Sequence, residues 1–219
     1  LSMAEQLYLN AAENHHLEAQ YVLGYCYVSG LGFKHDTSQA IRWLRTAALR
    51  GHSQAQYILG TVYQHGHAGI TVQRDEARKW LEMAAHNDHP DAQWRLAKIY
   101  ERGAMSGEND AMAKMIELLE KSAHQGHLQA MHDLAECYMH GSGVDRDGMM
   151  AAQWYELAAD KGHVESQYAI GNCYMDGTGV NASMVEAIKW HRLAAMQGHT
   201  LATSLFEHYQ REKTAISML

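Results

Sequence analysis

Small and apolar residues recur along this chain at intervals of 36 to 38 residues. Each repeat can be counted from a small residue that serves as its anchor. The anchors are Ala19, Ala55, Ala92, Ala130, Ser166 and Ala202. After each of the first five anchors, a large apolar residue follows at the fourth position, a small residue at the fifth and a tyrosine at the eighth. This spacing predicts the buried face of a helix, which we name helix A, and a glycine three positions after the tyrosine predicts its end.

A second apolar pattern lies between consecutive anchors and predicts another helix, which we name helix B. It contains one large residue, followed four and five positions later by a pair of small residues. The large residues are Trp43, Trp80, Leu118, Trp154 and Trp190. Each of them precedes the next anchor by 12 residues, so the differences in repeat length fall in predicted loops at residues 66–73 and 103–112.

Together the two patterns predict a single all-α repeat domain over residues 1–219. Residues 1–14 are expected to form a lone helix B. Residues 198–219 are expected to form a capping helix, because Glu207 replaces the small residue and Lys213 replaces the glycine. The five helix pairs between them are predicted at residues 15–50, 51–87, 88–125, 126–161 and 162–197.

These residues resemble the Sel-one-like repeat (SLR), a relative of the tetratricopeptide repeat (TPR). The family pattern is A-x-x-x-L-G-x-x-Y-x-x-G-x-G-V, then a tryptophan and paired alanines, and residues 166–180 match it except at Ser166 and Ile170. The third repeat departs from the pattern, because Leu118 replaces the tryptophan and Met105 and Ser106 interrupt the glycine turn. The resemblance implies a right-handed α/α superhelical solenoid of TPR-like helix pairs and a role in binding proteins.

Composition and charge narrow the classes of partner. The 219 residues include 18 Lys and Arg against 25 Asp and Glu, and the net charge of −7 argues against nucleic acid and anionic membranes. No apolar run approaches the ~20 residues of a membrane helix, and the first residues lack the features of a signal peptide. We expect a soluble protein that is monomeric without its partner. Three cysteines without a disulfide pattern favour the cytoplasm, although a removed signal would also allow the periplasm or secretion.

Sixteen histidines invite the hypothesis of a metal site, and their spacing argues against it. Six of them lie three positions before an anchor, so we expect them ~10 Å apart, too far to share one metal ion. They are His16, His52, His89, His127, His163 and His199. The closer pairs, His86 with His89 and His124 with His127, could reach one ion, but no cysteine accompanies them. We interpret the six as polar residues at helix starts and predict no metal site.

The three cysteines also share one repeat position, directly before the tyrosine. Cys137 and Cys173 are therefore expected ~10 Å apart, beyond the ~7 Å limit for a disulfide, and all three are expected to stay reduced. One SLR branch, the cysteine-rich bacterial proteins, has two cysteines per repeat, and some members are described as penicillin-binding or weak β-lactamases. That resemblance leaves a β-lactam-binding or hydrolysing protein as an alternative function, although this chain lacks the cysteine pairing.

Catalytic signatures are absent from the sequence. It contains no Ser-x-x-Lys, no G-x-S-x-G, no phosphate-binding G-x-x-x-x-G-K and no H-E-x-x-H. The Gly-x-Gly turns recur in step with the helices, which indicates helix ends rather than phosphate cradles. We therefore predict no enzyme activity, no catalytic residue and no cofactor.

The surface of helix A opposite its core is the predicted binding site. A step of about 100° per residue places the second, sixth and ninth residues after each anchor on an exposed side. They are Tyr21, Tyr25, Val28, Tyr57, Thr61, Gln64, Trp94, Lys98, Glu101, His132, Glu136, Met139, Tyr168, Asn172 and Met175. We name this set the helix A face. Its aromatic residues are either rigid anchors for a partner on a concave surface or packing residues against the next repeat.

The sequence thus predicts a non-enzymatic scaffold or adaptor that binds another protein or peptide on the helix A face. An inhibitor or immunity-type protein that sequesters a toxic bacterial enzyme is the more specific alternative, since the acidic charge suits a basic target.

Overall fold

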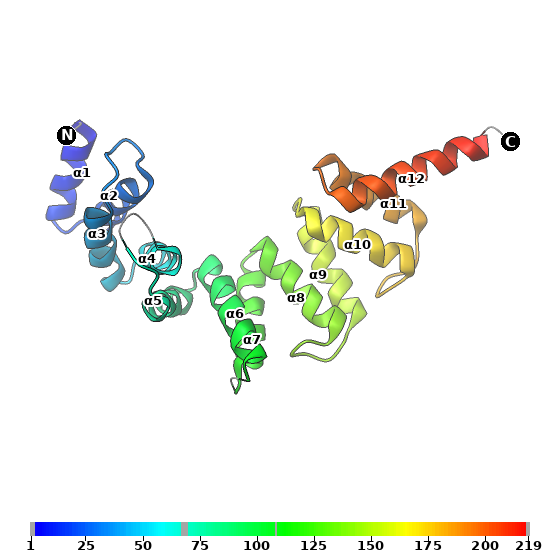
Figure 1. Cartoon of the computed structure of the whole chain (residues 1–219), viewed down its shortest axis with the longest axis horizontal. Coiled ribbons are helices and arrows are strands. Elements are labelled where there is room, and N and C mark those ends of the chain that lie inside the picture. The colour runs from blue at the N-terminus through cyan, green and yellow to red at the C-terminus, as the bar shows by residue number, and fades with distance from the viewer. Residues whose placement is uncertain (1–2, 67–69, 108, 218–219) are drawn as a thin grey trace. The chain divides into compact units, whose positions relative to one another are not determined.

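The computed structural model describes residues 3–66, 70–107 and 109–217, with side chains up to residue 211. These residues form twelve helices and, within that part of the chain, no strand. The helices are α1 Met3–Glu13, α2 Leu17–Ser29, α3 Thr37–Leu49, α4 Ser53–His65, α5 Arg74–His86, α6 Pro90–Met105, α7 Ala111–His124, α8 Leu128–His140, α9 Gly148–Asp160, α10 Val164–Asp176, α11 Met184–Met196 and α12 Thr200–Ser217. Figure 1 shows the alternation of helix A (even numbers) and helix B (odd numbers) along the chain. The predicted all-α class is confirmed.

The chain divides into two compact units, residues 1–99 and residues 100–219, with the boundary inside α6. In the first unit, α1 packs on α2, α2 on α3, α3 on α4 and α4 on α5. In the second unit, α7 to α12 pack in the same way, each helix on the next. This packing of sequential neighbours is that of a solenoid. The single repeat domain proposed over residues 1–219 stays a prediction.

Glycine ends most of the A helices, as the sequence predicts. Gly30, Gly141 and Gly177 follow α2, α8 and α10 in the left-handed conformation, and each donates its N–H to a carbonyl of the last turn. The expected end at Gly103 is wrong, because α6 continues to Met105 and a positive φ first occurs at Gly107. A glycine inside a helix costs only about 1 kcal/mol, and the residues after Gly103 are good helix formers. Part of the loop predicted at residues 103–112 is therefore helical.

The small residue at the fifth position after the anchor lets helix B approach helix A. A Cβ added to Gly24 would lie 2.7 Å from Leu44 Cγ, and one added to Gly60 would lie 2.7 Å from Leu81 Cγ. Both leucines are fully buried and directly follow the tryptophan of helix B. This position next to the tryptophan is a second core residue of helix B that the sequence analysis missed.

A buried glutamine joins each of four A helices to the preceding helix B. Its side-chain N–H donates to the carbonyl of the second alanine in the alanine pair, at 2.9 to 3.2 Å. These glutamines are Gln20, Gln56, Gln93 and Gln167. Met131 occupies the position in the fourth repeat. An amphipathic pattern assigns polar residues to the surface, and only the recurrence of glutamine after the anchor could have revealed this bond.

Candidate functional site

The structure places the helix A face in a half-buried setting rather than the exposed one predicted. All its members are half-buried except Tyr25, which is 40% exposed. The physical reason is that neighbouring A helices lie side by side, so that side chains leaving one helix contact those of the next. The packing alternative therefore accounts for part of this face.

Three tyrosines of the helix A face stack on a histidine of the following repeat. The ring centroids lie 4.4 Å apart for Tyr21 and His52, 4.6 Å apart for Tyr57 and His89, and 4.4 Å apart for Tyr168 and His199. Stacking fixes one side of each tyrosine ring. These tyrosines therefore link consecutive repeats.

The histidine in each stack also caps the start of helix A. In all six A helices that begin after such a histidine, its Nδ1 accepts the N–H of the anchor residue. The interpretation of the six histidines as helix-start residues is confirmed. A nitrogen that accepts a hydrogen bond carries no proton itself. The neutral ring therefore has its proton on Nε2.

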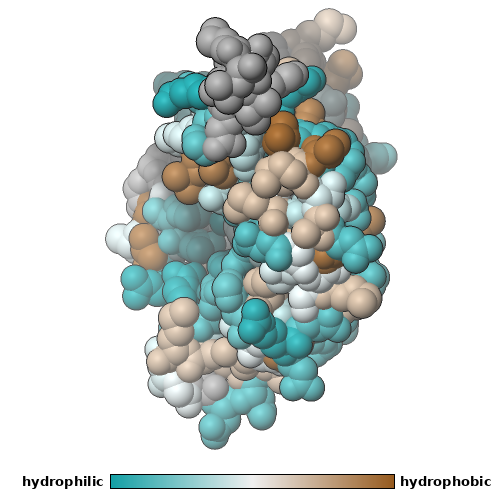
Figure 2. All heavy atoms as spheres, turned by 90° about the vertical axis from the view of Figure 1, so that its right-hand side faces the viewer, coloured by the Kyte–Doolittle hydropathy of each residue, from teal (hydrophilic) through white to brown (hydrophobic). Residues whose placement is uncertain are grey.

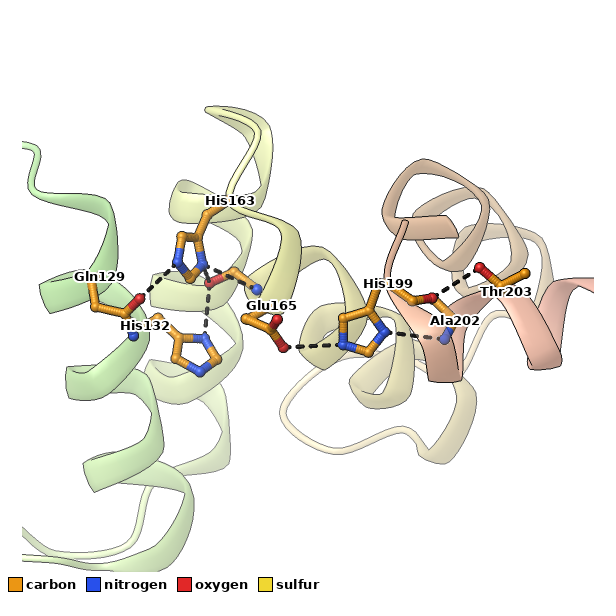
Figure 3. Close-up of polar contacts among 8 residues, drawn as sticks. Gln129, His132, His163, Glu165, His199, Ala202 and Thr203 are labelled. Atoms are coloured by element: carbon orange, nitrogen blue, oxygen red, sulfur yellow. Dashed lines mark hydrogen bonds and ion pairs between the residues drawn. The ribbon is translucent and has the colours of Figure 1, made fainter. Parts of the chain in front are cut away.

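The Nε2 proton reaches back to the preceding helix A. In the first unit His89 Nε2 lies 2.7 Å from Gln54 Oε1, and in the second His199 Nε2 lies 3.0 Å from Glu165 Oε2. Figure 3 shows the second contact and the equivalent bond from His163 to Gln129. Glutamine and glutamate thus perform the same task in different repeats.

The fifth repeat contains a buried hydroxyl where the others have an alanine anchor. Ser166 Oγ lies 3.0 Å from His132 Nδ1 and 2.9 Å from His163 Nδ1. His132 occupies the position that holds tyrosine or tryptophan in the other repeats. The two departures from the pattern satisfy each other, because a buried hydroxyl without a partner would be destabilising. Ser166 is fully buried and therefore out of reach of a substrate.

A pocket of about 360 Å³ opens on the helix A face of the second unit. Helices α8, α9 and α10 supply most of its walls. Its lining residues are His132, Glu136, Met139, Tyr155, Glu165, Tyr168, Ala169, Asn172, Cys173, Asp176 and Thr178. Five of the predicted binding residues meet here, namely His132, Glu136, Met139, Tyr168 and Asn172. We name this cavity the acidic pocket, after its three carboxylates.

The electrostatics of the acidic pocket follow from burial and from those carboxylates. Tyr155 is buried and donates its hydroxyl to Glu136 Oε1, and burial together with this bond raises the pKa of Tyr155. Glu136 Oε2 also lies 3.2 Å from His140 Nε2. Burial, helped by Asp176 and Glu136, raises the pKa of Cys173 to about 11. The phenol and the thiol are therefore protonated at neutral pH, and neither is an activated nucleophile.

The helix A face of the first unit has a different chemistry. Arg95 Nε donates to the Tyr57 hydroxyl at 2.9 Å, and the guanidinium lies 5.5 Å from the centroid of that ring. Tyr21 stacks on Tyr25, with centroids 6.2 Å apart. The other members in this unit are Val28, Thr61, Gln64, Trp94 and Lys98. The acidic pocket does not include them, nor Glu101 and Met175 of the second unit.

A second pocket, of about 490 Å³, lies in the first unit away from the helix A face. Residues of α1 and of the segment from α2 to α3 line it, among them Glu5, Lys34, Asp36, Arg42 and Trp43. Both carboxylates and basic groups line it, and Glu5 accepts the Tyr27 hydroxyl at 3.0 Å. Sequence reasoning missed this pocket, because its residues come from a loop and from three helices that do not share one periodic pattern.

Metal-binding groups and membrane-spanning helices are both absent from the described residues. No group of three or more His, Cys, Asp or Glu side chains there could hold a metal ion. None of the described helices is long and apolar enough to cross a membrane. Within the same residues no disulfide joins Cys26, Cys137 or Cys173. Hydrophobic residues on the side that carries the C-terminal helices form small separate groups among hydrophilic ones (Figure 2).

A model of the Sel1 repeat matches five consecutive segments of the chain, residues 17–52, 53–89, 90–127, 128–163 and 164–199. The chain belongs to the Sel1 repeat family. Each matched segment begins at or near the start of an A helix, so the predicted resemblance to Sel-one-like repeats is confirmed.

Known structures of Sel1 repeat proteins share this fold. The Escherichia coli protein c5321, a protective antigen of uropathogenic strains with an SLR fold, is 30% identical with a TM-score of 0.83, over 95% of this chain and 44% of that one. This chain thus spans less than half the length of c5321. A Sel1 repeat protein from Oxalobacter formigenes is 29% identical, with a TM-score of 0.77, over 87% of this chain and 77% of that one.

A more distant similarity is to the immunity protein Pa5087 from Pseudomonas aeruginosa. It is 21% identical, with a TM-score of 0.52, over 85% of this chain and 67% of that one. At this sequence identity, the similarity shows a shared fold and nothing about function. None of the curated protein sequences compared with this chain matches it significantly.

Proposed function

We propose that this Sel1 repeat protein is a non-enzymatic scaffold or adaptor that binds a partner protein through its helix A face. The observation that carries the proposal is the acidic pocket, which gathers five predicted face residues from two repeats into one cavity. Protein binding is also the usual role of the family. The protein is expected to be monomeric without its partner and to bind no nucleic acid.

The stacking of the face residues favours this function. Tyr21, Tyr57 and Tyr168 are held by histidines of the next repeat, so a partner would lose little side-chain entropy on contacting them. Rigid aromatic side chains are typical anchors of protein interfaces. The buried Ser166 and the protonated Cys173 offer no nucleophile for an enzymatic alternative.

The test is capture of the partner from the source organism with the tagged chain, followed by purification of the complex. The double variant Tyr25→Ala and Met139→Ala changes one face residue in each unit. Truncation of an anchor costs ~2 kcal/mol, so binding of the purified partner should weaken about 30-fold. The matched control is Leu49→Ala with Leu157→Ala, two exposed leucines of B helices. Loss of binding in the control and retention in the face variant would place the interface elsewhere.

An inhibitor or immunity-type protein is the second candidate. Residues 1–99 contain nine basic and nine acidic residues, whereas residues 100–219 contain nine basic and sixteen acidic ones. The entire net charge therefore lies in the second unit, and it suits a basic enzyme as target. If the captured partner is an enzyme, equimolar addition of this chain should abolish its activity. Full activity in the complex would leave the scaffold function and exclude inhibition.

A further inference from the structure

The composition of the acidic pocket differs from that of the protein surface as a whole. Three of its eleven lining residues are Glu or Asp, and the structure describes no Lys or Arg among them. The charged residues of the whole chain are more balanced, with 18 basic and 25 acidic ones. A negative cavity with low-dielectric walls concentrates its potential on a cation that enters it.

Two of the three carboxylates, Glu136 and Asp176, are not part of the common repeat frame. In the first two repeats Glu136 corresponds to Tyr25 and Thr61, and Asp176 corresponds to Ser29 and His65. The position of Glu165 holds Glu18 in the first repeat and Gln54 in the second. Gln54 accepts the histidine Nε2 proton as Glu165 does, so holding that histidine does not require a charge. The charges of Glu136 and Asp176 are thus additional to the repeat frame, and the charge of Glu165 is not required by the contact that it makes.

The remaining walls of the acidic pocket suit the aliphatic and planar parts of a basic side chain. Tyr168 lines the cavity, and its stacking on His199 fixes its orientation. Met139, Ala169 and Cys173 supply apolar surface beside it. An arginine side chain combines an apolar stem with a planar guanidinium that stacks on aromatic rings and donates to two carboxylate oxygens at once.

The carboxylates keep capacity for such a ligand. A carboxylate offers about four acceptor sites. Glu136 uses two for Tyr155 and His140, and Glu165 uses one for His199. These bonds also orient the two groups before a ligand arrives, which lowers the cost of binding.

We propose that the acidic pocket receives an arginine side chain from a basic segment of the partner protein. The inference rests on the proposed function and names the chemistry by which the partner is recognised. Glu136, Glu165 and Asp176 bind the guanidinium, and Tyr168 and Met139 contact the rest of the side chain.

The experiment uses the full chain and two capped pentapeptides, Ala-Ala-Arg-Ala-Ala and the same peptide with citrulline, its neutral isostere. Binding is followed by NMR titration at low salt. The arginine peptide should bind at least 10-fold more tightly than the citrulline peptide and shift resonances of α8 and α10. The double variant Glu165→Gln and Asp176→Asn should weaken arginine binding at least 10-fold. Its fold should persist, since Gln54 already plays the part of Glu165 in the first unit.

The matched control is Asp145→Asn with Asp160→Asn, which changes the net charge equally at two exposed positions outside the cavity. It should bind the arginine peptide as the wild type does. Equal binding of both peptides, no binding at millimolar concentration, or equal weakening in the control would each overturn the inference. A lysine peptide that binds more tightly than the arginine one would also overturn it. These outcomes leave the proposed function intact, because that is tested separately with the captured partner and the Tyr25 and Met139 variant.

Discussion

The two units share one repeat pattern and differ in the helix B residue that directly follows the tryptophan and packs against helix A. In the first unit the residue after the tryptophan is Leu44 or Leu81, and each is fully buried against a glycine of helix A. In the last two repeats of the second unit it is Tyr155 or His191. The frame thus tolerates polar groups at a core position, provided that they find partners.

Those partners sit at one position of the helix A face, the sixth after the anchor. Tyr155 donates to Glu136, and His191 Nε2 lies 3.0 Å from Asn172 Oδ1. The first unit has Tyr25 and Thr61 at that position. Substitutions in the core of helix B and on the face of helix A therefore come in matched pairs. Such pairing lets a repeat array vary the side chains of its helix A face while the core position of helix B stays filled.

The largest expected effect is the loss of an apolar residue at this core position in the first unit. Leu81→Ala should lower the free energy of unfolding by about 2 to 5 kcal/mol, because it leaves a cavity against Gly60. Urea denaturation of the full chain measures it. Leu49→Ala, at a position that is 66% exposed, is the control and should change stability by no more than ~0.5 kcal/mol. Equal effects would show that the position does not belong to the core.

The second largest effect is expected in the reactivity of the thiols, which should differ between the two units. Burial raises the pKa of Cys173 to about 11, whereas Cys26 in the first unit is half-buried. At pH 8 the thiolate fraction of Cys173 is then about 100-fold or more below that of an ordinary thiol. Alkylation followed by mass spectrometry should modify Cys26 first and Cys173 far more slowly than in the unfolded chain. Comparable native rates would contradict the burial of Cys173. Three reactive thiols are expected after denaturation without reductant.

A smaller effect is expected from the polar pair of the second unit. Tyr155→Phe removes the hydrogen bond to a charged Glu136 and should cost about 1.5 to 3 kcal/mol. A double-mutant cycle with Glu136→Gln isolates this bond from the packing of the ring. Coupling near zero would mean that the hydroxyl and the carboxylate act independently. Tyr63→Phe in the first unit is the control for removal of a tyrosine hydroxyl.

The sequence predicts the repeat frame well because apolar spacing reports directly on which side of a helix is buried. The six anchors that the spacing assigns to the core are all buried. The same reasoning fails for buried polar groups. Gln56 and His191 are almost fully buried, since each finds a partner on another helix, and a periodic pattern contains no information about such partners. The acidic pocket was not predicted for a similar reason. Its wall residue Tyr155 belongs to helix B, whereas the fifteen predicted residues all belong to helix A.

The smallest expected effect is a dependence of stability on pH that originates at one helix cap of the second unit. Burial lowers the pKa of His163, and nearby His132 and His127 lower it further, while Glu165 and Asp133 act in the opposite direction. The ring also caps α10 through Nδ1, a bond that a proton on Nδ1 would abolish.

Because the folded-state pKa of His163 lies below its unfolded value of ~6.5, the unfolded chain takes up the proton more readily. The stability contributed by the neutral ring is therefore present above pH ~6.5, and it is lost as the pH falls from there through the folded-state pKa. His163→Asn keeps a side chain that can cap the helix but cannot titrate in this range. Urea denaturation at pH 7.5 and pH 5.5 should show a smaller loss of stability in this variant than in the wild type. His52→Asn, the same change in the first unit, measures the cost of the altered cap itself at pH 7.5. An unchanged pH dependence in His163→Asn would mean that the cap of α10 does not sense the proton.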